Sequence, residues 1–154
     1  MKKTAIGPGD FRRDSVVAAL DVLPDRWSAL VLREAFFGVR RFSDFRRNLS
    51  IARNTLTDRL NRLVEQEVLE KRRVSDTNDW EEYRLTESGL DLYPVVVALM
   101  QWGDRWRAPD GPPLLLKHSD CKGALELTVA CQECAKPLTA RDVTFHEGPG
   151  LSKE

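Results

Sequence analysis

Apolar residues recur every three or four positions along the first two thirds of the chain, a spacing that predicts a series of amphipathic helices. The predicted helices cover 15–23 (SVVAALDVL), 26–37 (RWSALVLREAFF), 43–49 (SDFRRNL) and 52–66. Asp14 or Ser15 is expected to cap the first helix and Ser43 the third, while Gly38 suits a left-handed cap after the second. The chain therefore begins as a helical domain.

The helix at 52–66 has two unlike faces. Ala52, Leu56, Leu60 and Leu63 fall within about 80° of one another when each residue advances by about 100°, so one narrow stripe is expected to be buried. The rest of the surface carries polar and long side chains, among them Arg53, Asn54, Thr57, Asp58, Arg59, Asn61, Arg62 and Glu65. This helix is expected to present a polar, arginine-rich face to solvent or to a ligand.

The pattern changes to strands and back to a helix. Residues 68–85 alternate on both sides of the turn-forming SDTNDW and predict a β-hairpin, with Trp80 either pressing on a ligand or folding back on the hairpin. Thr86 should cap a final helix that Pro94 kinks or breaks near Tyr93. Positions 92–102 are apolar almost all the way round, which predicts cover by a second copy of the chain or by the C-terminal segment.

Length and charge narrow the class of protein. A chain of 154 residues fits one compact domain with an appendage. Its 24 basic and 24 acidic residues cancel, yet residues 38–73 hold ten basic against five acidic residues, which indicates an anion-binding face or merely a solvated one. No apolar run is long enough to cross a membrane, and MKKTAI is not followed by the apolar stretch of a secretory leader, so we expect a cytoplasmic protein.

Several dispersed strings occur together in one order: ALDVLPDRW (19–27), LVLREAFFGVRRFSDFRR (30–47), the run 51–63, EYRLTESG (82–89) and PVVVALMQWG (94–103). Together they resemble the HxlR family of bacterial regulators over residues 14–107. The resemblance implies a winged helix-turn-helix that dimerises through its terminal helices and binds operator DNA, most often as a repressor. The fold class expected is mainly α with a β-hairpin wing, followed by a small β-rich C-terminal extension at 108–154.

In such a fold the 52–66 helix enters the major groove, and the expected contacts follow from hydrogen-bonding chemistry. Base contacts are expected from Arg53, Asn54, Thr55 and Thr57. Phosphate contacts are expected from Arg40, Arg41, Arg46, Arg47, Arg59, Arg62, Arg72 and Arg73. Arg59 could equally pair with an acid of its own domain, such as Glu34. The dimer interface is expected to use Val16, Leu20, Tyr93, Val97, Met100, Trp102 and Trp106.

The C-terminal extension begins after the proline-rich APDGPP (108–113), and short alternating segments predict a few strands. His118, Cys121, Cys131 and Cys134 form two pairs with the spacing of zinc ligands. Three interpretations stay open: a structural zinc site, plain reduced cysteines, or redox chemistry at Cys131 and Cys134. Many proteins of this family carry a cysteine before the first helix, but Asp14 stands at the matching place, so thiol sensing would require the C-terminal cysteines.

Two other functions are weighed against DNA binding. A winged helix for protein contacts would usually expose a more apolar face at 53–62, and a thiol–disulfide enzyme using Cys131 and Cys134 lacks a βαβ frame. The sequence offers no catalytic Ser/His/Asp set and no glycine-rich phosphate loop, so we expect no enzyme activity. A small-molecule effector, if one acts, is expected between the final helix and the C-terminal extension.

Overall fold

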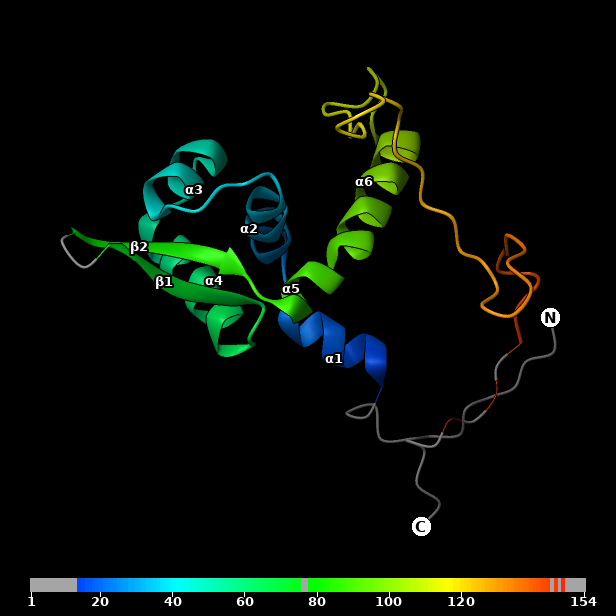
Figure 1. Cartoon of the computed structure of the whole chain (residues 1–154), viewed down its shortest axis with the longest axis horizontal. Helices are drawn as coiled ribbons and strands as arrows, with labels where there is room; N and C mark the ends of the chain where they lie inside the picture. Colours follow the sequence, from blue (N-terminus) through cyan, green and yellow to red (C-terminus); the bar gives the residue numbers. More distant parts are fainter. Residues whose placement is uncertain (1–13, 76–77, 145, 147, 149–154) are drawn as a thin grey trace, which may run out of the picture.

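The computed structural model describes residues 14–75, 78–144, 146 and 148. The opening MKKTAI segment and the centre of the predicted hairpin turn therefore lie outside the described residues. Six helices and two strands follow in the order α1 (Ser15–Val22), α2 (Arg26–Phe36), α3 (Phe42–Leu49), α4 (Arg53–Glu65), β1 (Leu69–Ser75), β2 (Asn78–Leu85), α5 (Glu87–Asp91) and α6 (Tyr93–Arg107) within the described part of the chain. Figure 1 shows β1 and β2 on one side of the molecule and α1 and α6 on the other.

Helices α2, α3 and α4 form the core, and α1 packs against it only through partly buried residues at its end. Asp14 caps α1, and its Oδ1 accepts a bond from the amide of Val16 at 2.7 Å. Gly38, at φ 89°, ends α2 with its amide donating to the Ala35 carbonyl at 3.1 Å, and the Val39 amide donates to Glu34. These two bonds are the paired C-terminal closure expected of a left-handed glycine, so the predicted cap at Gly38 is confirmed.

The start of α3 differs from the prediction. Ser43 was expected to be its N-cap, but the helix already begins at Phe42, with Arg41 as an N-cap that makes no side-chain cap bond. Phe42 packs against the core and Phe45 is fully buried, so burial of these rings fixes the first turn. The predicted serine cap is wrong because packing outweighs a contribution of about 1 kcal/mol from capping.

The core lies between α2, α3, α4 and the hairpin. Leu32, Phe45, Leu56, Leu60 and Leu63 have no exposed surface. The three leucines of α4 confirm the predicted stripe, except that Ala52 is exposed and stands before the helix as its N-cap.

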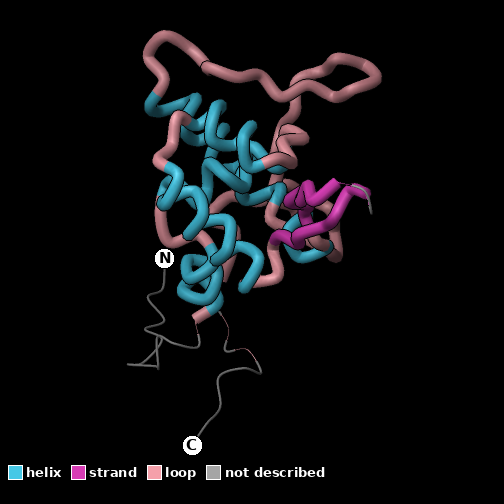
Figure 2. Tube along the Cα trace, turned by 90° about the vertical axis from the view of Figure 1, so that its left-hand side faces the viewer, coloured by secondary structure: helices cyan, strands magenta, loops and turns pink. Residues whose placement is uncertain are grey.

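The hairpin is a two-stranded antiparallel sheet in which Leu69 pairs with Leu85 and Arg73 with Glu81. Its base is held by the Tyr83 amide, which donates to the Arg40 carbonyl at 2.8 Å, and by the edge-to-face packing of Tyr83 on Phe45. Figure 2 shows the strands leaving the helical body as a separate arm. The wing is therefore oriented by its contact with the α2–α3 link.

The predicted final helix is divided in two. Thr86 caps α5, its hydroxyl accepting a bond from the Gly89 amide at 3.1 Å, and the break falls at Leu92 with Pro94 in the first turn of α6. Proline is tolerated there because the first amides of a helix have no intrahelical acceptor. The break expected near Tyr93 is confirmed.

The C-terminal extension is mostly loop (Figure 2). In place of the predicted strands, its described residues contain two isolated bridges, Lys117 with Ala124 and Ala130 with Pro137. Apolar side chains such as Leu115 and Val129 stay exposed. The alternating pattern did not produce a sheet because a single chain supplies no surface on which such strands could be buried.

Candidate nucleic-acid interface

The N-terminal turn of α4 carries the predicted base-reading residues. Arg53 and Asn54 are exposed, while Leu56 two positions later is fully buried. The Arg53 guanidinium lies 5.9 Å from the ring centroid of Phe42, which gives the side chain a platform at the helix start. Arg53 and Asn54 are thus presented outward from a rigid, buried helix, as base contacts in the major groove require.

The two threonines differ in how much they can offer a base. Thr55 is half-buried, whereas Thr57 is exposed, but its hydroxyl donates to the Arg53 carbonyl at 3.0 Å. Such a bond to the preceding turn leaves the methyl group and the oxygen lone pair of Thr57 available to a ligand. Of the four predicted base contacts, Arg53 and Asn54 are the better placed.

Arg59 makes an ion pair inside the domain. Its Nε lies 2.6 Å from the Asp25 carboxylate, and both side chains are 29% exposed. Asp25 also caps α2, its other oxygen accepting from the amides of Trp27 at 2.8 Å and Ser28 at 3.1 Å. Burial tends to raise the pKa of Asp25, but these two amides and the Arg59 guanidinium together hold that pKa below its usual value.

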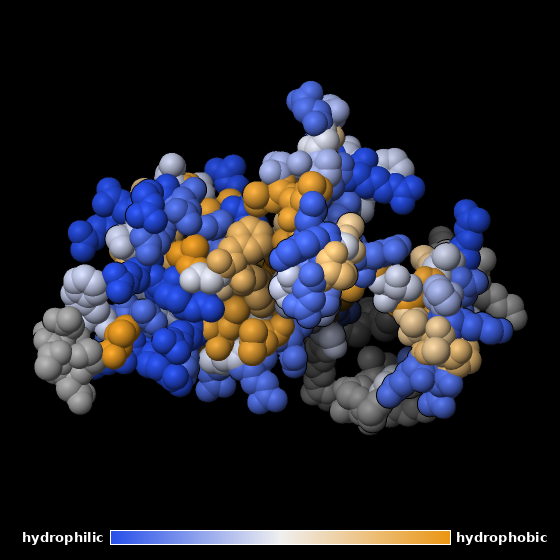
Figure 3. All heavy atoms as spheres, turned by 45° about the horizontal axis from the view of Figure 1, so that its top comes forward, coloured by the Kyte–Doolittle hydropathy of each residue, from blue (hydrophilic) through white to orange (hydrophobic). Residues whose placement is uncertain are grey.

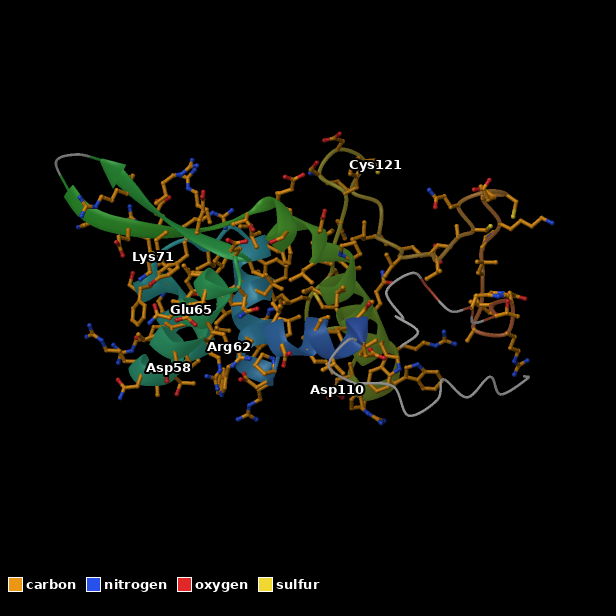
Figure 4. The ribbon with its side chains drawn as sticks, turned by 90° about the horizontal axis from the view of Figure 1, so that it is seen from below. Asp58, Arg62, Glu65, Lys71, Asp110 and Cys121 are labelled. Atoms are coloured by element: carbon orange, nitrogen blue, oxygen red, sulfur yellow. The ribbon has the colours of Figure 1, made fainter. Side chains whose placement is uncertain are left out.

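Arg62 joins two helices. Its Nε and Nη2 both donate to the Asp21 carbonyl near the end of α1, at 3.1 and 2.7 Å, and Figure 4 shows it between α4 and α1. Asp58, one turn earlier, points away from the body on the exposed side of α4 (Figure 4). Arg62 therefore fixes α1 on α4 instead of reaching outward.

Arg40 has a similar internal role. Its Nη1 donates to the carbonyl of Ala35 at 2.6 Å and to that of Val39 at 3.1 Å, and its own carbonyl accepts from the wing. Its guanidinium stabilises the C-terminus of α2, where the free carbonyls carry partial negative charge and a cation is favoured. Arg40, Arg59 and Arg62 are thus engaged within the chain, and their predicted phosphate contacts would require these bonds to be shared or broken.

The other arginines lie on the exterior. Arg46, Arg47, Arg72 and Arg73 are exposed, with Arg47 paired to Asp44 at 2.9 Å and Arg72 to Glu70 at 3.2 Å. Exposed pairs of this kind contribute about 0–1 kcal/mol, so a phosphate can replace the carboxylate at little cost. These four side chains are the ones best placed to set electrostatic affinity.

Sequence reasoning did not foresee the contact between Arg41 and Trp80. The Arg41 guanidinium stacks on the Trp80 ring at 4.6 Å from its centroid, because the Arg40–Tyr83 backbone bond aligns the two segments. Trp80 therefore packs on the α2–α3 link, while more than half of its surface stays exposed. The signal in the sequence was only a tryptophan two or three residues after a turn, which does not specify its partner.

A second surface is apolar. We use "apolar α1/α6 surface" for the exposed side chains Val16, Leu20, Val95, Leu99, Trp102 and Trp106. Hydrophobic side chains gather over the middle of the molecule in Figure 3, next to the hydrophilic wing side. Of the predicted interface residues, Val97 is only 2% exposed and Met100 packs against the core, so both serve the single chain, whereas Tyr93 is partly exposed and packs edge-to-face on Phe36.

The four candidate zinc ligands form two separate pairs. His118 Nδ1 lies 3.3 Å from Cys121 Sγ, and amide donors from Cys134 and Glu133, with the Cys134 thiol, hold the pKa of Cys131 below its ordinary value. Among the residues that the structure describes, no three His, Cys, Asp or Glu side chains are close enough to share a metal ion. The three cysteines are free thiols.

A buried core shared by α2, α3 and α4, an exposed start of α4 with Arg53 and Asn54, and an antiparallel hairpin beside α4 define a winged helix-turn-helix, the fold of DNA-binding transcription regulators. The model of the HxlR-like helix-turn-helix matches residues 22–110. The chain belongs to this family. Over the described residues, no helix is both long and apolar enough to cross a membrane.

Relatives and solved structures agree with this assignment. The HTH-type transcriptional regulator Rv3095 of Mycobacterium tuberculosis is 46% identical over 142 residues, which cover 92% of this chain and 90% of that protein. The structure of PA1607, named as a candidate transcription factor, is 36% identical with a TM-score of 0.80, covering 88% of this chain and 95% of that one. The structure of the reduced form of the Bacillus subtilis regulator YodB is 28% identical with a TM-score of 0.53, covering 60% of this chain and 92% of that one.

Proposed function

We propose that this winged-helix transcription regulator acts as a homodimer that binds operator DNA in a sequence-specific manner and represses transcription. The observation that carries the proposal is the exposed start of α4, where Arg53 and Asn54 stand on a helix whose other face is fully buried. Arginine bonds guanine and asparagine bonds adenine through two hydrogen bonds each, and each such pair contributes about 1–3 kcal/mol of discrimination.

The apolar α1/α6 surface supports the homodimer. Helix α1 has eight residues and buries none of them in the single chain, and a helix of this length is marginal in water on its own. Trp102 and Trp106 are 54% and 58% exposed, and each ring stacks with an arginine of its own helix. Large exposed aromatic side chains of this kind are typical of interface cores.

Repression requires little beyond this geometry. A dimer with two α4 helices about 34 Å apart would occupy two half-sites one helical turn apart, and a protein seated on a promoter blocks polymerase without a further contact surface. The direction of regulation rests on the family resemblance. An effector site between α6 and the C-terminal extension stays a prediction.

The test compares Arg53→Ala with Arg46→Ala on DNA from the region upstream of the chain's own gene and on random DNA. Arg53→Ala should lose about 1–3 kcal/mol of affinity for the operator and little for random DNA, because it removes a base contact. Arg46→Ala should weaken both to a similar degree, because it removes a phosphate contact. Equal losses for both variants on both DNAs would contradict the placement of α4 in the groove.

A further inference from the structure

The C-terminal extension contains the same turn twice, thirteen residues apart. In the first copy the His118 amide donates to the Gly123 carbonyl at 2.9 Å and the Lys122 amide to the His118 carbonyl at 3.0 Å. In the second copy the Cys131 amide donates to Lys136 at 3.0 Å and the Ala135 amide to Cys131 at 2.9 Å. The two turns therefore have one hydrogen-bond pattern.

The repeat extends to both flanks of the turns. The bridges Lys117–Ala124 and Ala130–Pro137 occupy matching positions. One step further out, the Leu125 amide donates to Leu116 at 3.1 Å and the Leu138 amide to Val129 at 2.8 Å. Residues 116–125 and 129–138 are thus two copies of one small hairpin, although their sequences have little in common.

Each copy holds two side chains of the types that bind zinc at its first and fourth turn positions: His118 and Cys121 in the first, Cys131 and Cys134 in the second. The residue after the second ligand has a positive φ in both, 61° at Lys122 and 55° at Ala135. Residues other than glycine adopt this conformation at a cost of about 1 kcal/mol. The same strained backbone conformation at matching positions of two otherwise unlike sequences indicates that both turns meet the same structural requirement.

The donor geometry within each turn suits zinc. Zn–N of about 2.0–2.1 Å and Zn–S of about 2.3 Å in a tetrahedron place the two donor atoms about 3.5 Å apart, and His118 Nδ1 lies 3.3 Å from Cys121 Sγ. The Gly123 amide points to Cys121 Sγ at 3.4 Å, and the Glu133 and Cys134 amides point to Cys131 Sγ. Asp120 lies 3.9 Å from His118 Nε2, the side from which metal-binding histidines take an outer partner.

The extension also needs an added source of stability. Nearly every described residue from 109 to 144 is exposed, and the contact with the helical body includes the Gln101 side chain bonded to Leu125 at 2.8 Å and Leu127 at 3.2 Å. A small unit without a core usually folds with a metal or a disulfide. Figure 1 shows the two turns apart, joined by an extended stretch in yellow and orange, and Figure 4 shows Cys121 on the outside of the first turn.

We propose that the two turns close on one Zn²⁺ ion, bound tetrahedrally by His118 Nδ1 and the thiolates of Cys121, Cys131 and Cys134. The first hairpin ends at Leu125 and the second begins at Val129, so the two turns close on one ion by rotation at residues 126–128 between them. Binding releases three protons from the three thiols, since cysteine coordinates as the thiolate. The ion gives the extension the fixed structure that its exposed side chains cannot provide.

The test is the metal content of the full chain purified without added metal. One zinc per chain is expected, and the double variant Cys131→Ser/Cys134→Ser should lose it, as should His118→Ala/Cys121→Ser. The matched control Ser119→Ala/Gln132→Ala changes both turns at positions without ligand atoms and should keep the zinc. Helical circular dichroism of every variant should match that of the parent chain, because none of the substituted residues lies in a helix.

A second measurement is independent of the metal acquired in cells. The chain is stripped of metal with a chelator under reducing conditions and titrated with Co²⁺. The intense visible d–d bands of tetrahedral cobalt and the near-ultraviolet sulfur-to-cobalt charge-transfer band should both saturate at one ion per chain. A chain that contains no zinc and gives only weak octahedral cobalt bands would overturn the proposal. So would a Cys131–Cys134 disulfide in the purified chain, or zinc retained by both double variants.

Discussion

Asp25 both caps α2 and forms an ion pair with Arg59, and two substitutions can measure the stability that each role contributes. Asp25→Asn keeps a side-chain oxygen for the Trp27 and Ser28 amides, since asparagine and aspartate cap about equally well, but it removes the charge opposite Arg59. Asp25→Ala removes both. The half-buried Arg59 then remains without its carboxylate in either variant.

The expected losses follow from these contacts. A lost cap costs about 1 kcal/mol, and a partly exposed ion pair contributes up to about 1 kcal/mol. Asp25→Asn should therefore lower the free energy of unfolding by up to about 1 kcal/mol and Asp25→Ala by about 2 kcal/mol. In a winged-helix domain of fewer than 100 residues (14–107), about 1 kcal/mol corresponds to a Tm shift of about 4–8 °C.

The pH dependence has a definite sign. The pKa of Asp25 is lower in the folded chain than its usual value of 3.8, so the stabilisation is fully present above that value and is lost as the pH falls through the folded pKa. The stability difference between the parent chain and Asp25→Asn should be constant from neutral pH to about pH 5 and shrink below pH 4.

Urea unfolding at a fixed protomer concentration measures these losses, since dimerisation makes apparent stability depend on concentration. Asp44→Asn is the control, because its partner Arg47 is 72% exposed, against 29% for Arg59, and the pair should contribute less than about 0.5 kcal/mol. If Asp25→Asn is as stable as the parent chain, or if its difference from the parent grows at low pH, the reasoning is refuted.

Three further predictions concern the wing, the dimer and the packing of α5. Arg72→Ala should weaken specific and random DNA alike and lower the slope of log affinity against log salt by about 1, so a loss confined to the operator would contradict it. Trp102→Glu should shift the chain towards a monomer in sedimentation, whereas Trp80→Glu, equally exposed but on the wing, should not; a stable Trp102→Glu dimer would exclude the apolar α1/α6 surface. Gly89→Ala should cost about 2–3 kcal/mol in urea unfolding, because its Cβ would lie 2.2 Å from the Val68 carbonyl oxygen, while Gly103→Ala in open space should be neutral or stabilising. Equal effects of the two glycine substitutions would argue against the close approach of α5 to the Val68 carbonyl before β1.

The fold could be predicted where local spacing decides the structure. The leucines of α4 recur every three or four positions and are all buried. Gly38 has the positive φ expected of a residue that ends a helix, and Pro94 lies in the first turn of α6, directly after the helix break. Each of these depends on residues within about one turn of the chain, which is the range that periodicity and capping describe.

The predictions that were wrong or incomplete concern contacts between residues far apart in the sequence. Arg59 was considered as a partner for Glu34 and is paired with Asp25, while Arg62 bonds the Asp21 carbonyl 41 residues away. Val97 could not be distinguished from Trp102 on an all-apolar helix until the core position was known. Distances between such residues are set by how the helices pack, and a single sequence does not record that packing.

The central claim is that α4 reads a DNA sequence as part of a dimer. Selection of the full chain against a pool of random duplexes, repeated at two salt concentrations, tests it most directly. We expect one enriched motif with two-fold symmetry and half-sites about one helical turn apart, bound in the presence of excess random DNA. Weak binding to every duplex, falling steeply with salt and enriching no motif, would contradict it and leave only an electrostatic surface.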